Sequence, residues 1–270
     1  MKKLFKILCL LLFLAFNQAV FAEDKTIAVI SDVHLSSDKS GENKMTPSIN
    51  NLLKAVDIIN QGNFEDVFFL GDNLNSANRY DLAMFAKIIK RIEKPTYVTV
   101  GNRDLSKTKG LLKKEYYRIL NKFSNNKLKT SPSYKKDGDF IFIFLLGVNE
   151  NIPSYRGYYK LAELDFLDET LTKFKDKKAV IFQHFPIVEP KEDEVRKIVK
   201  PENYLNVIKK HNNVIAIISG HYHMENVAEV DGIKHISVGS LNSTGEFEQI
   251  KFMENKDGTY TITTKILNVE

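Results

Sequence analysis

The feature that most constrains this chain is a set of five short apolar runs, each followed at once by polar side chains. The runs cover residues 26–30, 66–70, 96–100, 179–182 and 214–218. Runs of this length, rich in β-branched and aromatic residues, predict buried strands. Stretches with helical spacing at about 46–60 and 79–92 separate the first three runs. Strands that alternate with helices predict a mostly parallel sheet, whose carboxyl ends meet at one edge.

The polar residues after these runs form four motifs and one single histidine. They are Asp32-Val33-His34, Gly71-Asp72, Gly101-Asn102, His184 and Gly220-His221-Tyr222-His223. Together they offer carboxylate, amide and imidazole donors. Such a mixed set of oxygen and nitrogen ligands suits Mn, Fe, Zn, Co or Ni, and it is large enough for two adjacent divalent ions.

Each of these residues also has an ordinary structural role as its alternative. Asp32 and Asp72 could cap a helix or a turn, and Asn102 could occupy a left-handed turn. A lone histidine such as His184 is more often a partly buried core residue than a ligand. The shared position favours the metal interpretation, because every motif directly follows an apolar run. The sequence therefore predicts two metal ions at the carboxyl edge of the sheet.

The first 22 residues differ from the rest of the chain. Lys2, Lys3 and Lys6 form a basic start, an apolar stretch runs from Leu4 to Phe16, and Ala22 ends a run suited to a signal peptidase. This pattern predicts a signal peptide cleaved after Ala22, and hence a periplasmic or secreted protein. The alternative is an uncleaved anchor, but the apolar core is shorter than the ~20 residues that span a bilayer.

Residues 23–270 show no linker, repeat or low-complexity tract, so we expect a single domain after the signal peptide. The one cysteine, Cys9, lies within the signal peptide, and the mature chain needs no disulfide. Loss of three lysines lowers the net charge from +5 to +2, so charge indicates no particular partner. No transmembrane segment is expected in the mature chain.

The remaining sequence predicts a mixed architecture. The basic segment 107–136 is expected to be a loop around a helix near 112–123, and the later elements are a strand at 140–146 and helices at 161–174 and 202–210. Asp231-Gly232 and Asp257-Gly258 each separate two short apolar runs, which is a hairpin signal. The C-terminal part is therefore expected to be antiparallel.

The five motifs resemble those of the calcineurin-like metallophosphoesterases, and the resemblance covers nearly the whole mature chain. It rests on Asp32-x-His34, Gly71-Asp72, Gly101-Asn102, His184 and Gly220-His221-x-His223. It implies an α/β fold, a four-layer α/β/β/α sandwich of two mixed β-sheets. It also places a two-metal site at the C-terminal ends of the strands.

The resemblance further implies a role for each ligand. One metal would be held by Asp32, His34 and His223, the other by Asn102, His184 and His221, and Asp72 would bridge them. A hydroxide held between the metals would attack phosphorus in line, while the ions neutralise the developing charge. The implied substrate is a small, nucleotide-like phosphodiester or phosphomonoester.

Two positions depart from the pattern of this superfamily. Asn75 stands where purple acid phosphatases carry a tyrosine, so an Fe(III)–tyrosinate site is not expected. Arg103 stands where most members carry a histidine that protonates the leaving group or binds phosphate. An arginine stays protonated near neutral pH and cannot be a general acid, although it binds phosphate oxygens well. We therefore expect esters whose leaving group needs little protonation.

We name Asn102, Arg103 and Asp104 as the catalytic candidates, with Asp104 expected to hold Arg103 in a salt bridge. Asn73 and Tyr155 are weaker candidates for substrate contact. The loops at 36–46, 105–136 and 149–160 are expected to select the substrate, although they carry no known motif.

Two other functions stay open from the sequence. One is a metal-dependent binding protein with little turnover, in which Arg103 holds a phosphorylated ligand. The other is a nuclease, which ranks lower because the chain lacks a basic groove interleaved with aromatic residues. Nucleic acid is therefore not an expected partner, and the oligomeric state is left open.

Overall fold

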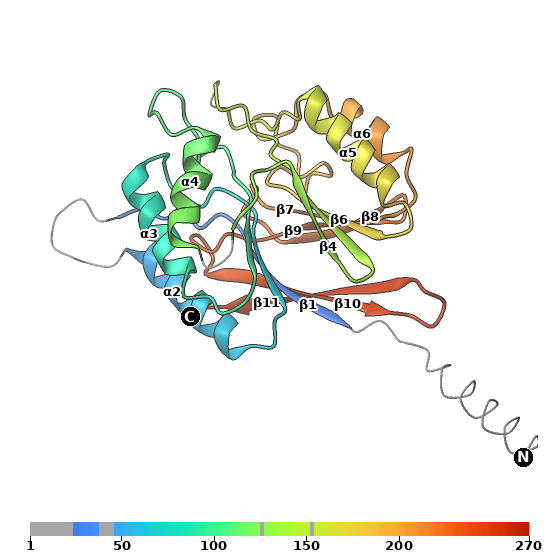
Figure 1. Ribbon diagram of the computed structural model, residues 1–270, viewed down its shortest axis with the longest axis horizontal. Coiled ribbons are helices and arrows are strands. Elements are labelled where there is room, and N and C mark those ends of the chain that lie inside the picture. Colours follow the sequence, from blue (N-terminus) through green and yellow to red (C-terminus); the bar gives the residue numbers. More distant parts are fainter. Residues whose placement is uncertain (1–23, 38–45, 125–126, 152–153, 270) are drawn as a thin grey trace, which may run out of the picture.

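The computed structural model describes residues 24–37, 46–124, 127–151 and 154–269 (Figure 1). The predicted signal peptide lies outside these residues. The strands are β1 (Lys25–Ile30), β2 (Asp66–Phe69), β3 (Thr96–Val98), β4 (Ser133–Asp137), β5 (Phe140–Phe144), β6 (Lys178–Phe182), β7 (Val214–Ser219), β8 (Asn226–Val230), β9 (Ile233–Ser237), β10 (Glu246–Glu254) and β11 (Tyr260–Asn268). The helices are α2 (Pro47–Gln61), α3 (Arg79–Ile89), α4 (Lys113–Phe123), α5 (Leu161–Lys173) and α6 (Pro201–Ile208).

The strands form two sheets, and both are mixed. In the first sheet the order is β11-β10-β1-β2-β3, with β1, β2 and β3 parallel and β10 antiparallel to β1. In the second the order is β4-β5-β6-β7-β9-β8, with β5, β6, β7 and β9 parallel and the two edge strands antiparallel. The predicted α/β fold with two mixed sheets is confirmed.

The alternation of side chains along the strands produces four layers. Ile27 and Val29 of β1 belong to the core between the sheets, where Phe68 stacks on Phe182 with ring centroids 4.1 Å apart. Residues on the other face of each sheet pack against helices instead. Figure 1 shows α2 and α3 beside the first sheet, and α5 and α6 over the second. The predicted four-layer sandwich is therefore confirmed.

Helix α2 illustrates how local sequence fixes these layers. The Thr46 hydroxyl accepts a hydrogen bond from the Ile49 amide at 3.4 Å and caps the helix, and Pro47 occupies the first turn. The buried residues Leu52 and Val56 lie one helical turn apart and face the sheet. The cap determines where the helix begins, and the apolar face determines which side packs on the sheet.

Two expectations about topology need correction. Strand β4 was not predicted, and its segment was expected to be a loop. Its sequence Ser-Tyr-Lys-Lys-Asp lacks apolar alternation, and the strand is ordered by its pairing with β5. The hairpins β8–β9 and β10–β11 are antiparallel, as predicted. However, the C-terminal part is not wholly antiparallel, since β9 also pairs in parallel with β7. Among the described residues, no helix is long and apolar enough to cross a membrane.

Candidate metal centre

The predicted ligands lie on the loops that leave β1, β2, β3, β6 and β7, as their positions after the strands require. Five of them have a left-handed backbone, with φ of 52° at Asp32, 44° at His34, 47° at Asp72, 74° at His221 and 55° at His223. Residues other than glycine rarely adopt this conformation, which costs about 1–3 kcal/mol each. Strained backbone at one sheet edge is typical of a functional site.

These side chains form two groups, and in each the candidate ligand atoms lie within 4.8 Å of one another. The first group contains Asp32, His34 and His223. Its histidine Nε2 atoms are 3.0 Å apart, and that of His223 lies 3.2 Å from Asp32 Oδ1. The second group contains Asp72, His184 and His221, with His184 Nε2 3.5 Å from Asp72 Oδ1.

Several atoms of this centre that could bind a metal are buried without a hydrogen-bond partner. They are Asp32 Oδ1, Asn102 Oδ1, His184 Nε2 and His221 Nε2, none of which has a hydrogen bond to another described residue. Leaving one such atom unsatisfied costs about 1–3 kcal/mol. Carboxylate oxygen, amide oxygen and imidazole nitrogen are the donors that divalent transition metals accept. The residues present therefore fit two divalent ions.

The opposite atoms of the same side chains are fixed by hydrogen bonds. His184 Nδ1 lies 3.2 Å from the Leu70 carbonyl oxygen, so Nδ1 carries the proton and Nε2 keeps its lone pair. Asp32 Oδ2 accepts hydrogen bonds from Ser31 Oγ at 2.6 Å and from the His221 amide at 2.8 Å. These contacts aim the free atoms of His184 and Asp32 into the centre.

The electrostatics of the centre also suit cations. Burial lowers the pKa of His184 to about 4 and that of His221 to about 3, so both rings are neutral near pH 7. Burial, followed by the charge of Asp32, raises the pKa of Asp72 to about 7. Burial also opposes ionisation of Asp32, but the imidazoles of His223 and His34, whose Nε2 atoms lie 3.2 and 3.6 Å from its Oδ1, hold its pKa well below the usual value. Neutral imidazoles beside two carboxylates form a site in which positive charge is missing.

Two glycines allow the loops to approach this closely. A Cβ atom at Gly220 would overlap Ser31 Oγ and would lie 2.7 Å from Asp32 Oδ2. A Cβ atom at Gly101 would overlap Asp72 Oδ1. Any larger residue at either position would push a carboxylate out of the centre.

Asp104 does not form the expected salt bridge with Arg103, so that prediction is wrong. Its carboxylate is fully buried and accepts hydrogen bonds from the amides of Gly101 at 2.8 Å and Leu74 at 2.9 Å, and from Asn73 Nδ2 at 3.2 Å. These buried N–H groups need hydrogen-bond acceptors, and together they use both oxygens of the Asp104 carboxylate. Asp104 therefore anchors the loop that carries Asn102. Asn73, the weak candidate for substrate contact, belongs to the same buried network.

Arg103 points toward the metal centre instead. Its side chain is 38% exposed, and Nε lies 3.7 Å from Asp72 Oδ2, while its amide donates to Asp72 Oδ1 at 2.8 Å. Nη1 donates to the Asn75 carbonyl oxygen at 3.3 Å, and the guanidinium carbon lies 5.9 Å from the centre of the Tyr155 ring. The guanidinium is thus placed beside Asp72 and open to solvent.

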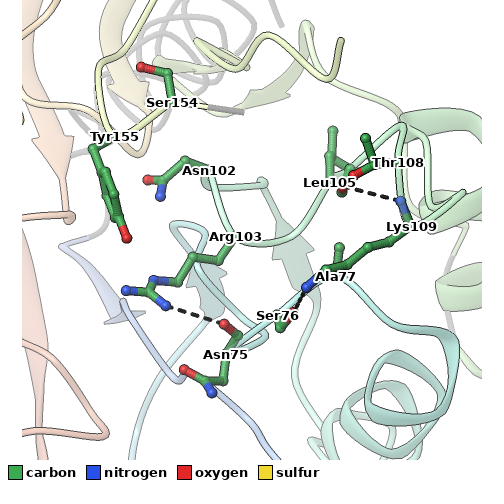
Figure 2. A pocket seen from close by; sticks show the side chains of 11 residues that line it. Asn75, Ser76, Ala77, Asn102, Arg103, Leu105, Thr108, Lys109, Ser154 and Tyr155 are labelled. Atoms are coloured by element: carbon green, nitrogen blue, oxygen red, sulfur yellow. Dashed lines mark hydrogen bonds between the residues drawn. The ribbon is translucent and has the colours of Figure 1, made fainter. Parts of the chain in front are cut away.

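Asn102 and Arg103 also line a cavity of about 370 Å³ beside the centre (Figure 2). The sequence indicated Tyr155 in this wall, but it did not identify Ser76 or Lys109. Neither residue belongs to a motif. The only signal was that Lys109 lies in a loop expected to select the substrate.

A four-layer sandwich with two such donor groups at its strand ends defines the class of two-metal phosphoesterases. Residues 25–225 match the calcineurin-like phosphoesterase family model. The chain belongs to this family, and it is a metal-dependent phosphoric ester hydrolase.

The chain is also similar to individual proteins in sequence or in fold. The chain is 27% identical over 212 residues to a probable glycerophosphodiester phosphodiesterase of Arcobacter nitrofigilis, covering 73% of this chain and 71% of the relative. The fold is similar to that of TT1561 of Thermus thermophilus, with a TM-score of 0.63, 14% identity, and coverage of 92% of this chain and 100% of the other. It is also similar to a dimetal phosphatase of Danio rerio, with a TM-score of 0.64, 16% identity, and coverage of 91% and 99%.

Proposed function

We propose that the two donor groups hold two divalent ions and that the chain hydrolyses small phosphodiesters. The first ion would be held by Asp32, His34 and His223, and the second by His184 and His221, with Asp72 of the second group and Asn102 as further ligands. The observation that carries this assignment is the set of buried donor atoms without partners at one sheet edge. The mixed donors suit Mn, Fe, Zn, Co or Ni.

When bound, the two ions supply an activated water and positive charge facing the phosphoryl oxygens. The residues of the chain supply position and further charge. Arg103, held beside Asp72, binds a phosphoryl oxygen, and Asp104 fixes the loop on which Asn102 and Arg103 lie. Hydrolysis breaks one phosphorus–oxygen bond, with the hydroxyl group going to phosphorus and a proton to the departing alkoxide.

The choice of phosphodiesters has two supports. The relative in Arcobacter nitrofigilis carries the name of a phosphodiesterase. In addition, Arg103 cannot protonate a leaving group, so the departing alkoxide takes its proton from solvent. Nucleotide-like diesters remain the first substrates to examine, and a nuclease remains the lower-ranked alternative.

A comparison of two chromogenic substrates tests this function. The protein is loaded with Mn²⁺ and assayed with bis(p-nitrophenyl) phosphate and with p-nitrophenyl phosphate. The diester rate is expected to disappear in Asp72→Ala and Asn102→Ala but to persist in Asp57→Ala, a change at an exposed residue of α2. Two bound metals per chain without turnover of any ester would contradict the proposal and favour the binding protein.

A second variant tests the role of Arg103. Arg103→His restores a group that can donate a proton, so we expect faster turnover of an alkyl phosphomonoester, whose departing alkoxide needs a proton, and little change with p-nitrophenyl phosphate, whose phenolate departs without one. An unchanged rate with the alkyl monoester would show that protonation of the leaving group does not limit this enzyme.

We also propose that the chain is exported and that residues 23–270 form one domain. The support is the basic and apolar composition of residues 1–22, together with the absence of cysteine from residues 23–270. Expression in a Gram-negative host, followed by N-terminal sequencing of the periplasmic fraction, should give a chain that starts at Glu23. An intact Met1 in the membrane fraction would contradict it.

A further inference from the structure

The cavity beside the metal centre is built from three loops that meet only in the folded protein. Residues 75–77 follow β2, residues 102–109 follow β3, and residues 154–155 follow β5. Asn102 and Arg103 line the cavity (Figure 2), and Arg103 also lies beside Asp72 of the metal centre. A phosphoryl group at the two ions would therefore have one of its ester substituents in this cavity.

The charges in the cavity wall are all of one sign. Arg103 and Lys109 line it, and among the described residues no aspartate or glutamate does. Figure 2 shows the guanidinium of Arg103 on one side and Lys109 on the other. Such a wall attracts an anion.

Lys109 is the cation in this wall that the metal centre does not use. Arg103 has Asp72 nearby, whereas Lys109 forms no ion pair with any described carboxylate. Its Nζ donates a hydrogen bond to Ser76 Oγ, which is a neutral partner. An ammonium group has three donors, so two remain for a ligand.

We propose that this cavity is the leaving-group subsite and that it selects esters whose leaving group ends in its own anion, a carboxylate or a phosphate. The inference rests on the proposed function. Lys109 binds the terminal anion, with Ser76 holding the ammonium group in place, while Arg103 stays with the phosphoryl oxygens. Lys109 is a specificity residue and takes no part in breaking the phosphorus–oxygen bond.

Four matched diesters test the proposal. Each is a methyl phosphodiester, and the second alkyl group ends in a carboxylate, a phosphonate, a hydroxyl or an ammonium group. We expect kcat/KM for release of the anionic alcohols to exceed that for the hydroxyl compound by about tenfold, as one charge-assisted hydrogen bond predicts. The ammonium compound should be the poorest. The faster of the two anionic compounds identifies the preferred anion.

Three variants assign the preference to Lys109. Lys109→Gln should reduce the ratio between anionic and neutral substrates to within about twofold, and Lys109→Glu should favour the ammonium compound. Lys114→Gln is the matched control, because Lys114 is an exposed lysine at the start of α4 and lies outside this cavity. An unchanged ratio in Lys109→Gln would overturn the proposal.

A binding measurement separates this proposal from the proposed function. A non-hydrolysable analogue of the carboxylate ester, in which a methylene group replaces the scissile ester oxygen, is titrated into the metal-loaded protein by calorimetry. We expect about tenfold weaker binding in Lys109→Gln, and equal binding would contradict the subsite. If no diester is hydrolysed with any metal, the proposed function fails while the binding result still decides the subsite. If the hydroxyl ester is hydrolysed but the charge preference is absent, only the subsite fails.

Discussion

Strands β1 and β2 carry buried charges at both ends, and the two ends treat those charges differently. At the start of the strands, Lys25 and Asp66 are both buried, and their charged atoms lie 3.0 Å apart. Lys25 Nζ also lies 2.6 Å from Asp137 Oδ2, and Lys135 Nζ lies 2.7 Å from Asp66 Oδ1. Each buried charge at this end therefore faces an opposite charge.

At the other end of the same strands the pairing is incomplete, since Arg103 Nε lies 3.7 Å from Asp72 Oδ2 but no described lysine or arginine pairs with Asp32. Asp32 and Asp72 face imidazoles, and burial lowers the pKa of His184 and of His221 so that both stay neutral. Asp32 Oδ1 and the Nε2 atoms of both histidines have no hydrogen bond to a described residue. This end combines two carboxylates with little positive charge.

The comparison teaches that burial of charged groups does not by itself mark a functional site. A cluster in which every buried charge has an opposite charge beside it is structural, because it leaves no charge unpaired. An incomplete set of convergent donors marks a place for a ligand that the chain does not supply. Substitutions in the paired cluster should therefore lower the stability of the protein, and substitutions in the incomplete set should lower its activity.

The largest effect is expected from Asp72→Asn. It should lower kcat/KM with Mn²⁺ by about 10³-fold or more, corresponding to ~4 kcal/mol, because a proposed ligand of the metal centre loses its charge. The same change in metal-free protein should leave the free energy of unfolding by urea unchanged or higher, since it removes a carboxylate that burial disfavours. A clear loss of stability in the metal-free variant would show that the two ends do not differ as described.

The next largest effect is expected from Asp66→Ala at the other end. This change removes the most buried partner of Lys25 and Lys135 and leaves them with Asp137, so the free energy of unfolding should fall by about 2–3 kcal/mol. The kcat/KM of the folded protein should stay within about twofold of the wild-type value, because the cluster lies at the opposite end of the strands. Urea unfolding monitored by circular dichroism measures the first quantity. A loss below about 1 kcal/mol would contradict the structural role.

Glu163 of α5 is a third kind of buried carboxylate, with hydrogen-bond donors but no ion pair to a described residue. It accepts hydrogen bonds from the amides of Leu146 and Gly147, and burial raises its pKa to about 7. The folded chain thus holds a proton that the unfolded chain releases at about pH 4.5. The resulting stabilisation is complete below pH 4.5 and disappears as the pH rises through about 7.

Glu163→Gln cannot titrate, so it isolates this contribution. Between about pH 4.5 and 7 the wild-type protein should lose about 2 kcal/mol of unfolding free energy relative to the variant. Urea unfolding at matched pH values measures the difference, and parallel pH profiles would contradict it. A confirmed difference would show that amide donors alone stabilise a buried carboxylate less than the ion pairs of Asp66 do.

The sequence predicted the parallel strands and brought the seven ligand candidates to one edge because both properties are local. An apolar run sets the strand, and a residue directly after it must lie at the strand end, as Asp32 and His184 do. The helix that begins after Thr46 was predicted at about 46–60 for the same reason.

The features that the sequence did not predict depend on contacts between distant segments. Strand β4 has a polar sequence and is ordered by β5, and Asp104 turns away from Arg103 because amides at Leu74 and Gly101 need its oxygens. Lys109 reaches the cavity only because three loops converge there. No periodicity or motif in the sequence predicts that these loops meet.

The central claim is that the unpaired donors at the carboxyl edge are two metal sites. It is tested most directly by equilibrium dialysis of the metal-stripped protein against Mn²⁺, with bound metal counted by mass spectrometry. We expect two ions per chain for the wild-type protein and for Asp66→Asn, and fewer than two for Asp72→Ala and His184→Ala. Two ions bound equally by all four proteins, or none bound by the wild type, would contradict the claim.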